Sequence, residues 1–122
     1  MSNYEPKDDI SRSAEAELNI AEVLHPSGAV RFRYARVLSP DGKSWIRHGL
    51  FRAYSEDGQL VSEGMYVNGL EEGRWRDFHS NGHLAAEGSY SAGKEHGVWR
   101  HWKADGTPEA ATNYVNGVEQ PG

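Results

Sequence analysis

The chain has 122 residues, a formal net charge of −5 and an apolar fraction of 37%. Its length predicts one domain, and its low apolar fraction excludes a thick core of aliphatic side chains. The 14 glycines, four tryptophans, six tyrosines and three phenylalanines instead predict a thin sheet covered by rings. The acidic balance argues against nucleic-acid binding, because phosphate backbones are neutralised by clustered Lys and Arg. A basic partner would suit this charge.

The sequence contains no cysteine, which excludes disulfides and thiolate metal sites. Its N-terminus lacks the basic start and apolar stretch of a signal peptide, and no apolar run approaches the length of a membrane span. We therefore expect a soluble, cytoplasmic protein that binds no membrane.

Residues 1–16 are polar and charged, which predicts a flexible tail compatible with one helical turn over 13–17. A single repeat domain is expected over 17–122. It begins with an irregular unit, residues 18–47, in which strands are predicted over 18–24 and 29–37 and a longer hairpin end over 38–46. Such irregularity is expected of a capping unit.

Three copies of a 24-residue unit follow, at residues 48–72, 73–96 and 97–119. Self-similarity at this period indicates a repeat architecture, in which each unit buries its apolar side by stacking on its neighbours. The recurring positions are Gly49, Gly73 and Gly97; Phe51, Trp75 and Trp99; Tyr54, Phe78 and Trp102; Gly58, Gly82 and Gly106; Tyr66, Tyr90 and Tyr114.

Each unit is predicted to be a β-hairpin, because Asp57-Gly58, Asn81-Gly82 and Asp105-Gly106 are pairs that favour two-residue type I′ turns. In that register Phe51 faces Gly64, Arg52 faces Glu63, Trp75 faces Gly88, Arg76 faces Glu87 and Phe78 faces Ala85. A ring opposite a glycine can lie across the bare backbone, so we expect each Phe or Trp to cover the glycine of its own hairpin.

Trp75 and Phe78 are three residues apart, so a regular strand would point them to opposite faces. Two structures satisfy this spacing: an open twisted sheet with rings on both faces, or a strand bent by a bulge near Arg76-Asp77. We favour the twisted sheet. Pro108 cannot donate a ladder hydrogen bond, which predicts that the last unit is an edge and a terminal cap.

No catalytic, metal or cofactor site is predicted. His79 and His83 flank a turn without a cysteine or recurrent carboxylate beside them, and they are better explained as turn residues. The chain has neither a Gly-x-Ser-x-Gly elbow nor a phosphate-binding glycine loop. Glu63 and Glu87 are predicted to face arginines, which stabilise a charged carboxylate and disfavour a role as general acid.

The recurring rings and arginines are the residue types that dominate protein interfaces, although repetition alone favours packing for most of the rings. Partner specificity is expected at positions that vary between units. The candidate partner-binding residues are Arg52, Ala53, Tyr54, Glu72, Arg76, Asp77, Phe78, His79, Arg100, His101 and Trp102.

The pattern Gly-x-Trp-x-x-Phe, Asn-Gly-x-Leu, Glu-Gly-x-Tyr-x-x-Gly of residues 73–93 resembles the bacterial variant of the MORN repeat. The resemblance covers about residues 47–117. It implies an all-β fold, an elongated antiparallel sheet of successive hairpins, and an association with antitoxin or immunity proteins, many of which carry such repeats.

The resemblance and the charge favour a non-catalytic module that neutralises a cognate toxin, itself possibly basic, by direct binding. The alternative is a structural or scaffold protein that self-associates through exposed sheet edges or docks another cytoplasmic protein. A lipid-binding role ranks last, because the chain lacks a basic patch.

Overall fold

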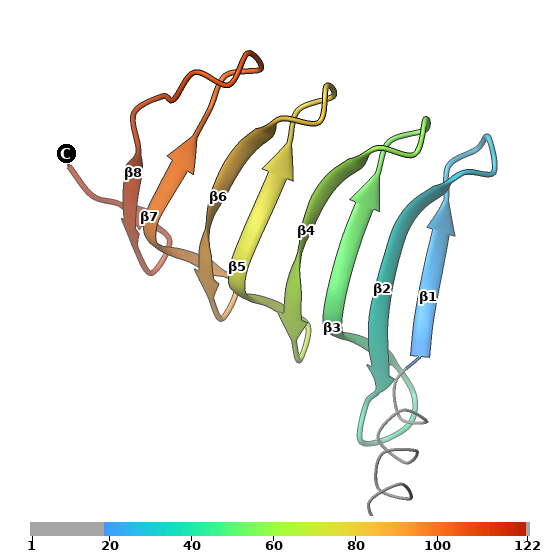
Figure 1. The fold of residues 1–122 in the computed structure, drawn as a ribbon. Helices are drawn as coiled ribbons and strands as arrows, with labels where there is room; N and C mark the ends of the chain where they lie inside the picture. The colour runs from blue at the N-terminus through green and yellow to red at the C-terminus, as the bar shows by residue number, and fades with distance from the viewer. Residues whose placement is uncertain (1–18, 122) are drawn as a thin grey trace, which may run out of the picture.

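The computed structural model describes residues 19–121, which form one open antiparallel sheet in which every strand pairs with the next along the chain (Figure 1). This confirms the predicted all-β sheet of successive hairpins. The predicted tail, its helical turn and the domain start at residue 17 lie outside the described residues. The strands are β1 (Asn19–Leu24), β2 (Val30–Leu38), β3 (Trp45–Tyr54), β4 (Leu60–Val67), β5 (Leu70–Phe78), β6 (Leu84–Ser91), β7 (Lys94–His101), β8 (Thr112–Val115) and β9 (Val118–Glu119).

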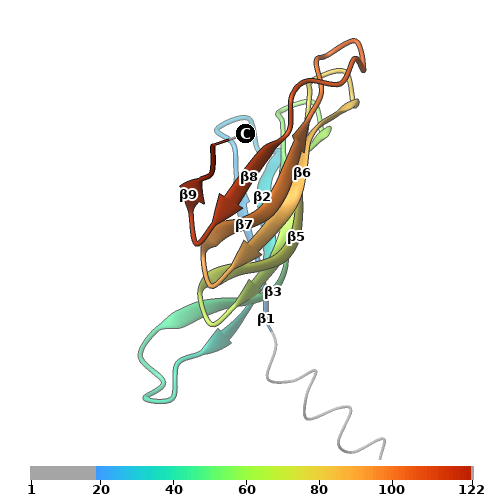
Figure 2. The same cartoon turned by 90° about the vertical axis from the view of Figure 1, so that its left-hand side faces the viewer.

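Seen from the side, the sheet is a single layer whose strands change direction from β1 to β8 (Figure 2). The first unit has its predicted strands at β1 and β2, and its longer hairpin end projects beyond the other units (Figure 2). The last unit lies at the C-terminal edge of the sheet, as predicted, but Pro108 is not in the edge strand. Pro108 makes only an isolated bridge to Trp102, β8 begins at Thr112, and β9 is the C-terminal edge.

The turns at the Asp-Gly and Asn-Gly pairs are three-residue loops, so the predicted two-residue type I′ turns are wrong. His79 N–H donates to the His83 carbonyl at 2.8 Å, and Gly82, at φ 89°, closes the loop. Asn81 keeps a negative φ, because its side-chain oxygen accepts the His83 N–H at 3.0 Å. A type I turn followed by a left-handed glycine therefore replaces the I′ turn.

Type I′ turns do occur, at the opposite end of the sheet. Residues 68 and 69 have φ values of 49° and 85°, residues 92 and 93 have 50° and 86°, and residues 116 and 117 have 50° and 83°. These pairs are Asn-Gly, Ala-Gly and Asn-Gly in chain order. Alanine is the exception, because only glycine and asparagine adopt the left-handed region at low cost.

Replacing Ala92 by Asn is therefore expected to stabilise the protein, by about 1 kcal/mol. The reciprocal change, Asn68→Ala, should cost a similar amount at the equivalent position. Urea unfolding monitored by tryptophan fluorescence measures both. A shift of the two variants in the same direction would contradict the assigned backbone conformation at these turns.

Most of the predicted register is confirmed. Phe51 pairs with Gly64, Arg52 with Glu63, Trp75 with Gly88 and Arg76 with Glu87. Phe78 pairs with Leu84 rather than Ala85, because the ladder shifts between Asp77 and Phe78. The three-residue loop moves the pairing by one residue, and a bulge absorbs the difference. The sheet therefore has Trp75 and Phe78 on opposite faces, as in the first alternative, and also a bulge close to Asp77, as in the second.

The core is a row of rings on one face. Phe51, Trp75 and Trp99 are 7%, 7% and 6% exposed. Tyr66 and Tyr90 stand between them, with ring centroids 5.2 to 5.8 Å from their aromatic neighbours. Edge-on contacts of this kind stabilise beyond the area that they bury.

The ring that covers each glycine comes from the following hairpin, which corrects the prediction that it comes from the same one. A Cβ atom on Gly64 would overlap the indole of Trp75, and one on Gly88 would overlap the indole of Trp99. The pairing between hairpins shifts at these glycines, between Glu63 and Met65 and at the equivalent point of the next unit. The indole therefore lies on the glycine backbone and joins consecutive hairpins.

Candidate interaction surfaces

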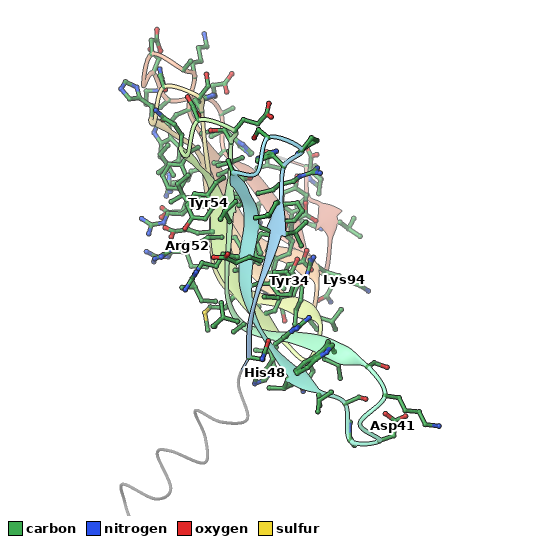
Figure 3. All side chains as sticks on the ribbon, turned by 90° about the vertical axis from the view of Figure 1, so that its right-hand side faces the viewer. Tyr34, Asp41, His48, Arg52, Tyr54 and Lys94 are labelled. Atoms are coloured by element: carbon green, nitrogen blue, oxygen red, sulfur yellow. The ribbon has the colours of Figure 1, made fainter. Side chains whose placement is uncertain are left out.

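Alternating side chains give the sheet two chemically different faces, and Tyr34 and Arg52 lie on opposite sides of it (Figure 3). The aromatic face is defined by Tyr34, Phe51, Tyr66, Trp75, Tyr90, Trp99 and Tyr114. The charged face is defined by Glu22, Arg33, Arg52, Glu63, Arg76, Glu87 and Arg100, which pair in that order across β1 to β7.

The charged face alternates arginines and glutamates except where Arg33 pairs with Arg52, and several of these side chains form ion pairs. The Glu63 carboxylate lies 2.6 Å from the Arg76 guanidinium and 3.4 Å from that of Arg52. The Arg33 guanidinium lies 2.6 Å from the Glu22 carboxylate. Exposed pairs of this kind each contribute at most about 1 kcal/mol. Because they lie directly across from each other, these side chains favour the observed register of the strands and also form a polar surface.

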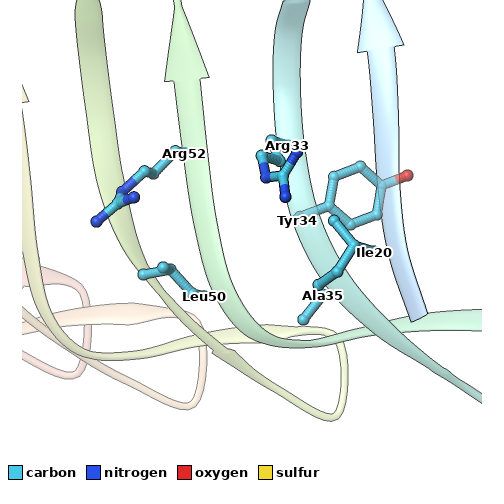
Figure 4. Close-up of a pocket in the computed structure, with 6 residues that line it drawn as sticks. All are labelled: Ile20, Arg33, Tyr34, Ala35, Leu50 and Arg52. Carbon is cyan, nitrogen blue, oxygen red and sulfur yellow. The ribbon is translucent and has the colours of Figure 1, made fainter. Parts of the chain in front are cut away.

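Hollows along the charged face measure about 70 to 250 Å³. Between β2 and β3 the hollow is about 70 Å³ and is lined in part by Ile20, Leu50 and Arg52 (Figure 4). Ligand clefts usually measure about 300 to 1,000 Å³, so this hollow is too small to enclose a drug-sized molecule. The face therefore offers a surface for contact and not an enclosed cleft at this point.

The structure divides the predicted partner-binding residues between several places. Their strand positions place Arg52, Tyr54, Arg76, Phe78, Arg100 and Trp102 with the charged face, and Ala53, Asp77 and His101 with the aromatic face. Ala53 is 8% exposed, which leaves it little area for a partner. Asp77 accepts the Ser62 hydroxyl at 2.7 Å.

Glu72 and His79 hold neighbouring hairpins together. The Glu72 carboxylate accepts the Ala92 N–H at 2.9 Å, and the His79 Nε2 lies 2.7 Å from the Trp102 carbonyl. His48 and His96 occupy the position of Glu72 in their units and accept turn N–H groups in the same way. All four residues are structural links between neighbouring segments, a role that was not predicted from the sequence for any of them.

A second row on the aromatic face was missed from the sequence. Tyr66 pairs with Glu71, Tyr90 with Glu95 and Tyr114 with Glu119, so each half-buried tyrosine lies directly across from a carboxylate. The available signal was the 24-residue spacing of these glutamates.

Tyr90 lies at the centre of this row. Burial, with the nearby carboxylates of Glu95, Glu71 and Asp77, raises its pKa from 10.0 to about 12. A phenol whose pKa is higher in the folded protein stabilises the fold fully below its unfolded pKa, and this contribution is lost as pH rises towards the folded pKa.

The free energy of unfolding is therefore expected to fall between about pH 10 and pH 12 partly through Tyr90. Tyr90→Phe should show a shallower decline over that interval, because it has no hydroxyl to ionise. Urea unfolding of both proteins at a series of alkaline pH values measures the difference. Parallel pH profiles would contradict the raised pKa.

Within residues 19–121, no group of three or more His, Asp or Glu side chains is placed to hold a metal ion. No helix in that part of the chain is long and apolar enough to cross a membrane.

Comparison with protein families gives a match over two hairpins. The family model for the MORN repeat variant matches residues 47–68 and 71–92. Two hairpins of the chain are thus similar to MORN-variant repeats. The first MORN match covers most of β3 and all of β4, and the second covers nearly all of β5 and all of β6. Each therefore includes one ring, one covered glycine and one tyrosine of the aromatic face. No curated protein matches the chain.

Proposed function

We propose that this protein is a non-catalytic, cytoplasmic binding module that neutralises a cognate bacterial toxin by direct contact. MORN repeats are in general modules that bind proteins or membranes. The observation that carries the proposal is the row of half-buried tyrosines with carboxylates on an open sheet face. Tyrosine is a dominant residue of protein interfaces, and this row has no covering element among residues 19–121.

A protein is the better ligand of the two that MORN repeats generally take. Membrane surfaces are negatively charged on their cytoplasmic side and attract clustered Lys and Arg. The chain instead carries a net charge of −5, which would be repelled by such a surface. The same charge speeds the encounter with a basic protein by electrostatic steering.

The test is a tagged pull-down from the native host with mass spectrometry, followed by coexpression with any stoichiometric partner. The proposal predicts a partner whose expression alone arrests growth and whose toxicity disappears when this protein is coexpressed. A stoichiometric partner that is harmless alone would contradict the toxin-neutralising role and leave a general binding module.

A second candidate function is a scaffold that self-associates through sheet edges. It is favoured by β1, which has no strand on its outer side among residues 19–121 and exposes Ile20 and Leu24, both at 53%. Light scattering over a concentration series tests this function. A monomer at all concentrations would contradict it, whereas recovery of self-copies alone in the pull-down would support it.

A further inference from the structure

We propose that the aromatic face binds an extended basic segment of the partner, whose arginine side chains contact the tyrosine row beside Glu71 and Glu95. This inference rests on the proposed function and specifies its partner chemistry. A basic peptide segment is the expected ligand, because the chain itself already places one arginine in an equivalent setting.

That arginine is Arg47, at the N-terminal end of the row. Its guanidinium carbon lies 4.6 Å from the centroid of Tyr34, 5.2 Å from that of Phe51 and 5.4 Å from that of Tyr66. Its Nη1 also donates to the Tyr66 hydroxyl at 3.3 Å. Contacts of a cation with ring faces at these distances are attractive, and the planar guanidinium suits them.

The repeat places glutamates where Arg47 stands. Residues 47, 71, 95 and 119 are spaced by 24 and are Arg, Glu, Glu and Glu. The backbone equivalence is direct, because the carbonyls of Arg47, Glu71 and Glu95 each accept the N–H of the glycine in the next type I′ turn, at 2.8 to 2.9 Å. The later units therefore have the same backbone setting with a carboxylate in place of the internal cation.

The rings near Glu71 and Glu95 repeat the setting of Arg47. We call each such group of rings, together with the residue at the position of Arg47, a step. Tyr66, Trp75 and Tyr90 surround the first step, and Tyr90, Trp99 and Tyr114 surround the second. Among residues 19–121, the cation–ring contacts are those of Arg31, Arg36 and Arg47, all on β2 and β3. Each later step thus combines rings with a carboxylate and lacks a described cation, which is the complement of an arginine side chain.

The spacing of the steps selects the conformation of the bound segment. Glu71 and Glu95 lie on β5 and β7, two strands apart, which corresponds to about 9.5 Å. A polyproline II helix advances about 9.3 Å in its three-residue turn. A segment that crosses the strands in this conformation would therefore present one arginine to each step if arginine recurred at every third residue.

The experiment uses the full chain and two synthetic peptides of identical composition, measured by fluorescence anisotropy. One peptide repeats Pro-Pro-Arg, and the other places its arginines side by side. We expect the repeating peptide to bind at least tenfold more tightly. Equal affinities would overturn the inference, because attraction by net charge alone does not depend on spacing. Binding of neither peptide would overturn it as well.

The matched variants are Glu71→Arg/Glu95→Arg and Glu56→Arg/Glu109→Arg, which change the net charge equally. The first pair places an internal arginine at each step, as Arg47 does, and should fold normally while losing at least tenfold in affinity for the repeating peptide. The second pair alters exposed glutamates at residues 56 and 109 and should lose much less. Equal losses would overturn the inference.

The two proposals can fail separately. If the pull-down yields a neutralised toxin that binds the Glu71→Arg/Glu95→Arg variant as tightly as the unaltered protein, the proposed function stands and the basic-segment inference falls. If the repeating peptide binds as described while no toxic partner exists, the recognition chemistry stands and the toxin-neutralising function falls.

Discussion

Gly88→Ala is expected to destabilise the protein by about 3 kcal/mol, because the new methyl group would displace a buried ring. A Cβ atom on Gly88 would overlap the indole of Trp99, which is 6% exposed. Removing a buried Trp side chain typically costs about 3 to 5 kcal/mol, and expelling one is of the same order. That loss is a large part of the roughly 5 to 15 kcal/mol by which domains are stable.

A double-mutant cycle identifies the ring responsible. In the Trp99→Ala background, Gly88→Ala should cost far less, whereas Trp75→Ala should give no such relief. His101→Ala is the control, because this half-buried side chain makes no hydrogen bond within residues 19–121. Relief by Trp75→Ala instead of Trp99→Ala would place the covering ring in the same hairpin.

Trp75→Ala is expected to destabilise the protein by about 3 to 5 kcal/mol. The indole lies on the Gly64 backbone and its centroid is 5.7 Å from the Phe51 ring. Its Nε1–H donates to the Met65 carbonyl at 3.1 Å, which further fixes the ring. The substitution therefore removes a contact between two hairpins as well as buried apolar area.

Trp102→Ala is the comparison within the same residue type. Trp102 is half-buried and lies at the end of the last regular strand pairing, where its backbone bridges Pro108. We expect it to cost less than half as much as Trp75→Ala in urea unfolding. Equal costs would show that the rings of the charged face carry the core to the same extent as those of the aromatic face.

The regular spacing of glycines and rings predicted the hairpins. The pairing of Trp75 with Gly88 was predicted from a two-residue turn, and it holds because the bulge between Asp77 and Phe78 offsets the extra loop residue. The turn types could not be predicted from the Asp-Gly and Asn-Gly pairs alone. The same dipeptide supports a type I′ turn at Asn68-Gly69 and a three-residue loop at Asn81-Gly82. The side-chain bond from Asn81 to the His83 N–H distinguishes them, and it depends on loop geometry.

The ring that covers each glycine was also beyond sequence reasoning. A glycine in the middle of a sheet has a neighbour on both sides, and the register within a hairpin specifies only one of them. The shift between hairpins at Glu63 and Met65 decides in favour of Trp75. Such shifts depend on bulges, which the repeat spacing does not reveal.

The tyrosine row and its glutamates, which we propose as the interaction surface, were not in the predicted set of partner-binding residues. Rings and charged side chains were expected to carry binding, and the predicted residues combined the recurring arginine and ring positions with positions that vary between units. Two of these, Glu72 and His79, instead link neighbouring hairpins. The pairing of Glu71 and Glu95 with the tyrosine row, and the contacts of Arg47 with its rings, are known only from the structure.

The most direct test of the aromatic face as the binding surface measures growth rescue from the partner captured in the pull-down. It compares the Glu71→Arg/Glu95→Arg and Glu56→Arg/Glu109→Arg variants, after thermal melts show that both are folded. We predict that the first variant fails to rescue growth and the second rescues it fully. Full rescue by both would contradict the assignment of binding to the aromatic face.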